Sequence, residues 1–318
     1  MSQPPRHHRP YGFRNNYSVD RHSTREALAW LPKFLMQKWV RPDFPVRTPD
    51  LTPFDGGAQA ALSWIGHSTF LVQWGGKRLL TDPVFGRRAS PVGFAGPERL
   101  TRAAMKVSEL PPVDFALISH NHYDHLDDGT VRRLAKRFPQ ITFVVPLGLK
   151  AWFAQRGITR VVELDWWDSA EVCGLRVHAV PAQHFSGRST SDRNRTLWCG
   201  FIVEDPQGKK LYFAGDTGYS QDFPDIGARF APVDLALLPI GAYAPRWFMK
   251  SMHVNPDEAV QIHQDLQSRQ SVAMHWGTFR LTEEPLDEPP QRLREVLRER
   301  GIDEQRFWVL AHGETRVL

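Results

Sequence analysis

The segment LISHNHYDHLD, residues 117–127, places three histidines and one aspartate within six residues, directly after an apolar run. These four are His120, His122, Asp124 and His125. Packing four polar, titratable side chains beside a buried strand is costly in free energy unless another group satisfies them. The segment therefore predicts a metal-binding site at the end of a strand, and the fold has to bring further ligands to that point.

Three other apolar runs also end in a residue that binds metal ions well. VHAVPAQ is followed by His184, LYFAG by Asp216, and SVAM by His275. Ligands fixed at the ends of rigid strands are what a preorganised site needs. A lone histidine at the end of a strand is more often only hydrogen-bonded. His184 and His275 become ligand candidates because the cluster at 120–125 is present in the same chain.

The seven candidate ligands indicate two metal ions rather than one. His120 and His122 lie two residues apart, so in an extended segment their side chains point the same way. The turn that follows carries Asp124 and His125 to a second position. Seven ligands would crowd one ion, whereas two ions bridged by a carboxylate use them all and leave room for water and substrate. Imidazole with carboxylate suits zinc, so we expect two Zn²⁺ per chain, with iron or manganese as less favoured alternatives.

From residue 60 onward, short apolar runs rich in β-branched residues alternate with turn residues, which is typical of strands. The longest of them, SWIGHSTFLVQW, spans residues 63–74, and RFWVLAHGE near the end of the chain is another. Dispersed helices covering layers of sheet are expected, which is an α+β architecture. Asn255 and Pro256 are suited to the N-cap and first position of one helix. Amphipathic stretches predict helices at 128–138, 147–157, 255–267 and 289–300.

The first 55 residues differ from the rest in charge and composition. Residues 1–50 hold nine Lys/Arg and four Asp/Glu, an excess that equals the net charge of +5 for the whole chain. Ser23 and Glu26 form a capping-box pattern before a helix whose surface carries bulky apolar residues. We interpret 1–55 as a basic segment that either contacts a membrane face or is a solvated tail, with 56–318 as the catalytic domain.

Cys173 and Cys199 give no disulfide framework and fit a reducing compartment, so a cytoplasmic location is expected. Residues 51–318 hold 31 charges of each sign and no basic nucleic-acid module, so no nucleic-acid partner is expected.

The blocks HNHYDH, PAQH, FAGDTG and MHWGTF, in this order, resemble the metallo-β-lactamase superfamily. That resemblance implies an αβ/βα four-layer sandwich, with two mixed sheets packed together, helices on the outer faces and a binuclear site at one edge. It also implies a division of the ligands between the two ions: His120, His122 and His184 on one, Asp124, His125 and His275 on the other, and Asp216 between them.

A narrower resemblance extends from about residue 60 to the end of the chain. WIGHSTFLV, LTDPVF, SELPPVDFALISHNHYDHLD and IGAYAPRWFMKSMHVNPDEAV are similar to the N-acyl-phosphatidylethanolamine-hydrolysing phospholipase D family. This similarity implies a zinc phosphodiesterase that cuts a phospholipid into phosphatidic acid and an N-acylethanolamine, using metal-activated hydroxide, and it suggests a homodimer. The first 50 residues match only loosely, and membrane contact is expected to differ there.

Several other residues are candidates for supporting roles. His253 is expected to act in catalysis beside Asp124, by binding a phosphate oxygen or protonating the leaving alkoxide, although a partly exposed histidine before a helix is the plain alternative. Asp82, in LTDP, either orients a ligand histidine or only forms a turn. Three aromatic residues of the loop AYAPRWF are candidates for binding an acyl chain: Tyr243, Trp247 and Phe248.

The remaining histidines are given no catalytic role. His67 is expected near the same sheet edge without an assigned function. The others fall into two groups, structural histidines (His178, His263 and His312) and histidines of the amino-terminal tail (His7, His8 and His22).

The alternatives are a metal-dependent lactonase or thioesterase, since such metal sites also polarise carbonyls, or another phosphodiester hydrolase on the same fold. Two other classes disagree with the pattern. An oxygen-reducing di-iron protein would carry glutamate at the position of His122, and a non-catalytic relative would lack a ligand. The acyl chain, the native metal and the oligomeric state are left open by the sequence.

Overall fold

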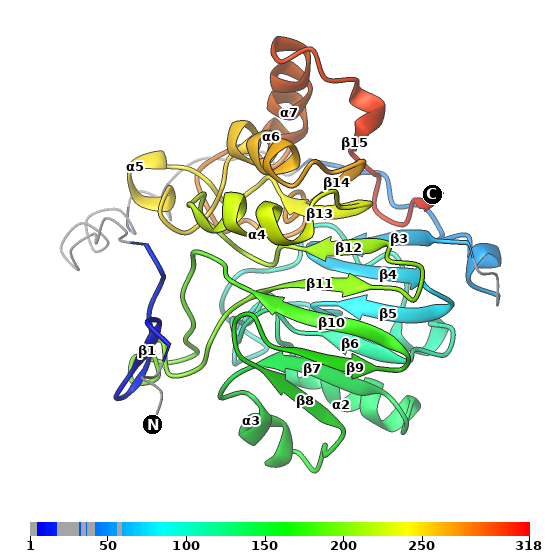
Figure 1. Ribbon diagram of the computed structural model, residues 1–318, viewed down its shortest axis with the longest axis vertical. Helices are drawn as coiled ribbons and strands as arrows, with labels where there is room; N and C mark the ends of the chain where they lie inside the picture. The colour runs from blue at the N-terminus through cyan, green and yellow to red at the C-terminus, as the bar shows by residue number, and fades with distance from the viewer. Residues whose placement is uncertain (1–4, 18–31, 33–35, 37–41, 56–58) are drawn as a thin grey trace.

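The computed structural model describes residues 5–17, 32, 36, 42–55 and 59–318, and within them two seven-stranded mixed sheets pack face to face (Figure 1). The first sheet has the order β16 (Thr315–Val317), β3 (Ala61–Gly66), β4 (Thr69–Trp74), β5 (Lys77–Thr81), β6 (Phe115–Leu117), β7 (Thr142–Pro146), β8 (Val161–Leu164). The second has the order β15 (Phe307–Trp308), β14 (Gln270–Met274), β13 (Leu235–Pro239), β12 (Lys210–Phe213), β11 (Gly200–Glu204), β10 (Leu175–Val180), β9 (Ser169–Val172).

Each sheet is antiparallel in one half and parallel in the other. Strands β16, β3, β4 and β5 pair antiparallel, and β5 to β8 pair parallel. In the second sheet, β9 to β12 pair antiparallel, and β12 to β15 pair parallel. Because β6, β10, β12 and β14 all run toward the same edge, the residues that follow them gather there.

The core lies between the two sheets and under the helices. On β3 and β4, Trp64 and Phe70 face the second sheet, whereas Ile65 and Leu71 face the helices on the outer side. This alternation follows from the two-residue period of a strand, and both sets of side chains are fully buried. Burial on both faces at about 25 cal/mol per Å² of apolar surface gives the sheets their main stabilisation.

Helices cover the outer face of each sheet (Figure 1). Residues of α2 (Asp128–Arg137) and α3 (Lys150–Ala154) pack in the cluster that covers the first sheet. Residues of α4 (Asp222–Phe230), α6 (Pro256–Asp265) and α7 (Glu288–Glu299) pack in the cluster that includes the second sheet. The predicted α+β sandwich is confirmed. Short elements complete the described fold: β1 (His8–Arg9), β2 (Gly12–Phe13), η1 (Thr52–Phe54), η2 (Val107–Glu109), η3 (Glu304–Arg306) and α5 (Arg246–Met249).

The predicted helices form, with one shortened. The N-cap prediction for Asn255 is confirmed, because its side chain accepts a hydrogen bond from the backbone N–H of Glu258. The stretch 147–157 is helical only over α3. Two helices, α4 and α5, were not predicted. The α5 turn lies where a loop was expected, and the carbonyl of Pro245 closes it by accepting from two N–H groups of the turn.

Other local expectations also differ from the structure. The run 63–74 forms two strands, joined at a turn that includes His67, and only Phe307–Trp308 of the run 306–314 is a strand. The helix predicted from the capping box at Ser23 lies outside the described residues, as does His22. The division between 1–55 and 56–318 stays a prediction.

His7 and His8 are not tail residues. His7 is buried, and the two rings place their Nε2 atoms 2.6 and 2.7 Å from the two carboxylate oxygens of Asp165. His7 also stacks on Trp166, with ring centroids 4.4 Å apart. These contacts join residues about 158 positions apart, which local composition does not reveal.

Candidate metal centre

The structure brings the seven predicted ligands together at one edge of the two sheets. Four of them follow strands directly: His120 lies three residues after β6, His184 four after β10, Asp216 three after β12, and His275 one after β14. The loop after β6 then returns to the same place with His122, Asp124 and His125. Main-chain hydrogen bonds from residues 125 and 126 to the carbonyl of residue 122 close that loop.

His120, His122 and His184 form the first donor group. The Nε2 atom of His120 lies 2.7 Å from Nδ1 of His122, and Nε2 of His184 lies 3.2 Å from that same Nδ1. Burial lowers the pKa of His122 to about 3 and that of His184 to about 4, and it holds the pKa of His120 well below its ordinary value. The three rings are therefore neutral at physiological pH, so each has a nitrogen lone pair to offer.

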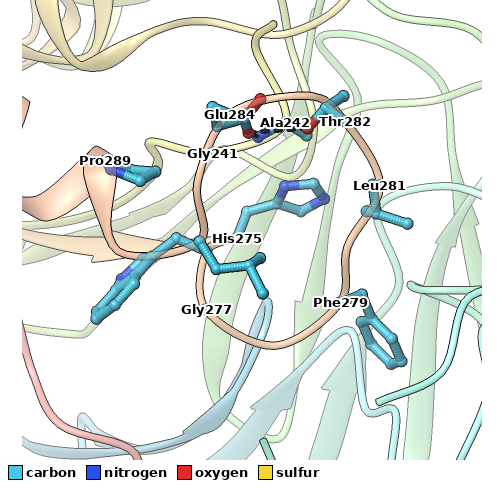
Figure 2. Close-up of a pocket in the computed structure, with 11 residues that line it drawn as sticks. Gly241, Ala242, His275, Gly277, Phe279, Leu281, Thr282, Glu284 and Pro289 are labelled. Atoms are coloured by element: carbon cyan, nitrogen blue, oxygen red, sulfur yellow. Dashed lines mark hydrogen bonds between the residues drawn. The ribbon is translucent and has the colours of Figure 1, made fainter. Parts of the chain in front are cut away.

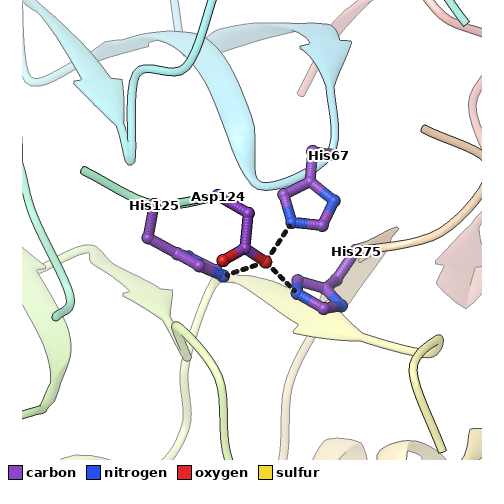
Figure 3. Close-up of side chains that lie close together, drawn as sticks. All are labelled: His67, Asp124, His125 and His275. Atoms are coloured by element: carbon purple, nitrogen blue, oxygen red, sulfur yellow. Dashed lines mark hydrogen bonds and ion pairs between the residues drawn. The ribbon is translucent and has the colours of Figure 1, made fainter. Parts of the chain in front are cut away.

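The second donor group surrounds one oxygen of Asp124 (Figure 3). Its Oδ2 atom lies 3.1 Å from Nε2 of His67, 3.4 Å from Nε2 of His125 and 3.6 Å from Nε2 of His275. Burial lowers the pKa of His125, but the carboxylates of Asp216 and Asp124 outweigh burial and raise it well above its ordinary value. At His275 burial is likewise outweighed by the carboxylate of Asp216, which raises the pKa to about 9, whereas burial lowers the pKa of His67 to about 3. Protons on His125 and His275 thus balance the buried carboxylates, and a bound cation would displace them.

Asp216 lies between the two donor groups. Its carboxylate oxygens approach His125 and His275 at 3.1 Å each, and His184 of the other group at 3.9 Å. Only 4% of its surface is exposed. A buried carboxylate that reaches both groups has the position that a bridging ligand requires.

The unsatisfied polar atoms of the centre fit bound cations. Several buried nitrogen and oxygen atoms of the centre have no hydrogen-bond partner, although an unsatisfied buried polar group is costly. Imidazole nitrogens with carboxylates are the ligands that zinc and similar divalent ions prefer. Two neighbouring cations would satisfy these atoms, which are His125 Nε2, His275 Nε2 and Asp216 Oδ1.

A further layer of hydrogen bonds fixes the orientation of the histidine rings. Asp82 accepts from Nδ1 of His125 at 2.6 Å and from the hydroxyl of Ser119 at 2.5 Å. That hydroxyl also lies 2.9 Å from Nδ1 of His120. The other ring nitrogen of His184 contacts the carbonyl of Met252 at 2.9 Å. Partners of this kind set the tautomer of a ligand histidine, and Asp82 contacts its histidine as the sequence predicts for an orienting carboxylate.

Three residues of the centre have left-handed backbone conformations, which are unfavourable for residues other than glycine. The φ angles are 56° at His67, 30° at Asp82 and 62° at His275. Such conformations cost of order 1–3 kcal/mol each and persist where the surrounding fold holds them. Their concentration at this edge is typical of a functional site.

His253 lies beside the centre, as the sequence predicts. Its ring centroid is 5.0 Å from that of His184 and 5.5 Å from that of His275, and its Nδ1 atom, which has no hydrogen-bond partner, lies 3.9 Å from Asp216. Arg246 donates to the main-chain carbonyl of His253 at 2.8 Å and anchors it to α6 through Glu258.

The three predicted acyl-binding aromatics have different environments. Tyr243 is buried, and its hydroxyl donates to Glu288 at 2.6 Å. Trp247 is 51% exposed on α5, and its ring centroid is 5.4 Å from that of Phe248. None of the three lines the pocket beside the centre (Figure 2). That pocket is lined by Gly241, Ala242, His275, Trp276, Gly277, Phe279, Leu281, Thr282, Glu284, Leu286 and Pro289. Acyl binding by the aromatics stays a prediction.

Two contributors to the centre had no role in the sequence analysis. His67 reaches Asp124; the sequence places it inside the apolar run 63–74, and no local pattern marks it as a contact of the centre. Arg188 donates to the carbonyls of Asn121 and Leu126, at 2.8 Å each, and so braces the loop that carries three ligands. No local pattern marks Arg188.

Comparison with known proteins identifies the family. Residues 77–276 match the family described as the beta-lactamase superfamily domain, which covers well over half of the chain. The protein belongs to the metallo-β-lactamase superfamily. Its similarity to named hydrolases and its fold, together with the candidate metal-binding His/Asp groups, show a metal-dependent hydrolase.

Two relatives and one solved structure support this assignment. The chain is 43% identical to N-acyl-phosphatidylethanolamine-hydrolyzing phospholipase D 1 of Caenorhabditis elegans over 264 residues, 80% of this chain and 74% of that protein. It is 38% identical to the mitochondrial N-acyl-phosphatidylethanolamine-hydrolyzing phospholipase D of Saccharomyces cerevisiae, over 80% of this chain and 55% of that one. The metallo hydrolase Igni18 of Ignicoccus hospitalis shares the fold, with a TM-score of 0.62, 22% identity, and coverage of 82% and 98%.

In the described part of the chain, no helix has both the length and the apolar character to cross a membrane.

Proposed function

We propose that this superfamily member is a phosphodiesterase of the phospholipase D type that uses two zinc ions to hydrolyse N-acyl-phosphatidylethanolamine-like phospholipids. The observation that carries the proposal is the pair of adjacent donor groups that meet at Asp216. Relatives whose names state this activity support the choice of substrate. A homodimer, a cytoplasmic location and contact with a membrane face stay predictions.

The donor groups suggest which parts of the chemistry the cations would supply and which the chain supplies. The two donor groups would hold two divalent cations, which when bound would supply an activated water and neutralise charge on the phosphoryl oxygens. The three neutral imidazoles of the first group add no charge of their own, whereas Asp124 places negative charge in the second group and Asp216 places it between the two. The chain itself fixes the geometry through buried, hydrogen-bonded ligands, which is what phosphoryl transfer requires of a protein.

His253 is positioned to act on the substrate directly. Its imidazole faces the centre, and the fold fixes its backbone through Arg246 and α6. A ring nitrogen at this point can bind a phosphoryl oxygen or transfer a proton to the leaving alkoxide. Neither role requires a serine or cysteine nucleophile.

Two aromatic side chains shortly before His253 in the sequence are candidates to contact the lipid chains. Trp247 and Phe248 lie on α5, six and five residues before that histidine, and Trp247 is half exposed. Aromatic rings at a site entrance suit an acyl chain, because they offer apolar area at little cost in conformational entropy. We propose that the acyl chain contacts these two side chains.

The proposal is tested by a hydrolysis panel on zinc-loaded protein, with products identified by mass spectrometry. The panel includes N-acyl-phosphatidylethanolamine, phosphatidylcholine, an acyl lactone and an acyl thioester. We expect N-acylethanolamine and phosphatidic acid, loss of turnover after chelation, and recovery on adding zinc. Release of free fatty acid, or turnover of the lactone or thioester alone, contradicts the proposal and supports carboxyl-ester chemistry on the same site. Full activity in metal-free protein contradicts it as well.

A further inference from the structure

The amino-terminal segment 5–17 is fixed to the catalytic body at several points. Figure 1 shows the dark-blue β1–β2 hairpin at the side of the view away from the carboxyl terminus. His7 and His8 contact Asp165, as described above, and the N–H of Phe13 donates to the carbonyl of Asn194 at 2.8 Å. Gly12 is required for this approach, because a Cβ there would lie 2.1 Å from that carbonyl oxygen, and its φ is +122°.

Beyond the hairpin, the segment reaches the metal centre through Asn15. The side-chain amide of Asn15 donates to the carbonyl of His184 at 3.0 Å, and its oxygen accepts from the N–H of His184 at 3.1 Å. The same oxygen accepts from the indole N–H of Trp198 at 3.0 Å. One asparagine thus satisfies both main-chain groups of a candidate ligand, as a neighbouring β-strand would do.

The backbone of His184 is held by this contact and not by strand pairing. It lies four residues beyond β10, outside the sheet, and the residue before it is held by hydrogen bonds to residues 217 and 218. The ring is oriented through Met252 at one nitrogen and faces His122 with the other. Only 2% of His184 is exposed, so its main-chain groups have no ready access to water if Asn15 is lost.

We propose that Asn15 is a positioning residue for the metal centre: by clamping the backbone of His184, the amino-terminal segment completes the donor group formed by His120, His122 and His184. This inference rests on the proposed two-ion centre and is independent of the lipid substrate. Asn15 lies outside the stretch 77–276 that matches the superfamily domain, so this chain supplies part of its centre from a segment beyond that domain.

The neighbouring Asn16 provides a matched control. Its side chain donates to Asp222 at 2.8 Å, and the next residue, Tyr17, donates to Asp225 at the same distance. Both contacts fasten the segment to α4 and touch no candidate ligand. If the segment only needs to be docked, Asn15→Ala and Asn16→Ala should have equal effects on the centre. If Asn15 positions His184, their effects should differ.

The experiment measures metal release from full-length protein without substrate. Wild-type, Asn15→Ala and Asn16→Ala proteins are loaded with zinc and mixed with excess 4-(2-pyridylazo)resorcinol, and the absorbance of the zinc complex is followed. We expect Asn15→Ala to release one zinc equivalent about 10- to 100-fold faster than wild type, as is usual when a partner of a metal ligand is lost, with little change in the other equivalent. Asn16→Ala should release both as wild type does.

A second measurement separates positioning from a general loss of folding. Cobalt-substituted Asn15→Ala should show an altered visible absorption spectrum, while its far-ultraviolet circular dichroism stays that of wild type. Asn15→Asp keeps the acceptor for the His184 N–H but loses the donor to its carbonyl, so its release rate should fall between those of wild type and Asn15→Ala.

Three outcomes overturn the inference: wild-type release from Asn15→Ala, equal acceleration by Asn16→Ala, or equal acceleration of both zinc equivalents. Wild-type protein that takes up fewer than two ions overturns the proposed centre itself, and the inference with it. Failure to hydrolyse any phospholipid affects only the proposed function, since no substrate is used here.

Discussion

The carboxylate of Asp82 accepts a hydrogen bond from Nδ1 of His125 at 2.6 Å, and both side chains are fully buried. Asp82 also receives the N–H of Ser119 at 2.7 Å and its hydroxyl at 2.5 Å. A carboxylate that receives three donors fixes the ring of His125 with Nε2 toward the centre. Through Ser119 it also reaches His120, so one buried aspartate connects ligands of both donor groups.

Replacing this aspartate should weaken metal binding while leaving every ligand in place. In Asp82→Asn, the amide offers one acceptor oxygen where the carboxylate offers two, so one donor loses its partner. We expect zinc affinity to fall about 10- to 100-fold. Competition with a chelator of known affinity measures this directly.

Asp127→Asn is the matched control for that substitution. Asp127 follows the ligand loop, caps α2 by accepting from the N–H of Gly129, and contacts no candidate ligand. Asparagine is an equally good N-cap, so zinc affinity should stay at the wild-type value. Equal affinities in the two variants would show that Asp82 forms only a turn.

Removing His253 should separate catalysis from metal binding. His253→Ala takes away the imidazole that faces the centre but none of the seven ligands. We expect turnover to fall on the order of 10²-fold or more, which is the usual contribution of general acid–base catalysis, and we expect two zinc ions to remain bound. Metal analysis and steady-state kinetics on the same sample test this. Unchanged turnover would exclude His253 from the mechanism.

Glu284 should stabilise the loop that leads to α5. Its carboxylate accepts from the N–H groups of Ala242 and Ala244, at 2.6 and 3.0 Å, and from the hydroxyl of Thr282 at 2.8 Å. In Glu284→Gln one acceptor oxygen becomes a donor and leaves an N–H without a partner. We expect the free energy of unfolding to fall by about 1–3 kcal/mol.

Urea denaturation measures that change, and Glu171→Gln is its control. Glu171 forms an exposed ion pair with Arg176 at 3.2 Å, and surface pairs contribute little to stability. The control should stay within about 0.5 kcal/mol of wild type. A Glu284→Gln protein as stable as this control would show that the loop does not depend on the carboxylate.

His263 should make the protein less stable in mild acid. Burial, with a smaller effect of the Arg306 charge, lowers the pKa of His263 from 6.5 to about 4, and its Nδ1 lies 2.8 Å from the hydroxyl of Ser271. Between these values the unfolded chain takes up a proton that the folded chain does not, so the free energy of unfolding falls as pH drops through this window. Above pH 6.5 the neutral ring of His263 makes its full contribution to the free energy of unfolding.

The size of this effect is about 1–3 kcal/mol, since each pKa unit corresponds to about 1.4 kcal/mol. His263→Asn keeps a polar atom near Ser271 but does not titrate. Denaturant unfolding of both proteins at several pH values from about 7 to 5 should give a shallower slope for the variant. Identical slopes would show that His263 takes no part in acid sensitivity.

The convergence of the candidate ligands could be predicted from sequence because strand ends are local features. Each of His120, His184, Asp216 and His275 follows an apolar run, and parallel strands deliver their carboxyl ends to one edge. His67 was harder to assign, because it lies inside an apolar run at a turn with a φ of 56°. Periodicity does not indicate where such a run breaks or which turn residue points at the centre.

Helix α4 shows why local signals fail elsewhere. Its sequence contains Pro224 and Gly227, which both weaken a helix prediction. The proline lies in the first turn, where no intrahelical N–H is needed. The glycine is needed for packing, because a Cβ there would lie 2.3 Å from the carbonyl of Asp265 at the end of α6. Tertiary contact, which no window of sequence contains, decides this helix.

The contacts of segment 5–17 could not be predicted from the sequence for the same reason. Asn15 and its partner His184 are 169 residues apart, and His7 and Asp165 are 158 apart. A basic, proline-rich composition indicated a segment that either contacts a membrane face or is a solvated tail, because composition describes the average of a segment. The packing of residues 5–17 on the rest of the chain depends on single side chains and their distant partners.

Anomalous X-ray diffraction at the zinc absorption edge, from crystals grown with zinc, would locate the metal ions of the two donor groups. We expect two peaks per chain at the edge of the sheets, both within bonding distance of Asp216. No peak there, or a single peak at full zinc occupancy, would contradict the proposed two-ion centre. The remaining ligands should divide between the peaks as His120, His122 and His184 around one, and Asp124, His125 and His275 around the other.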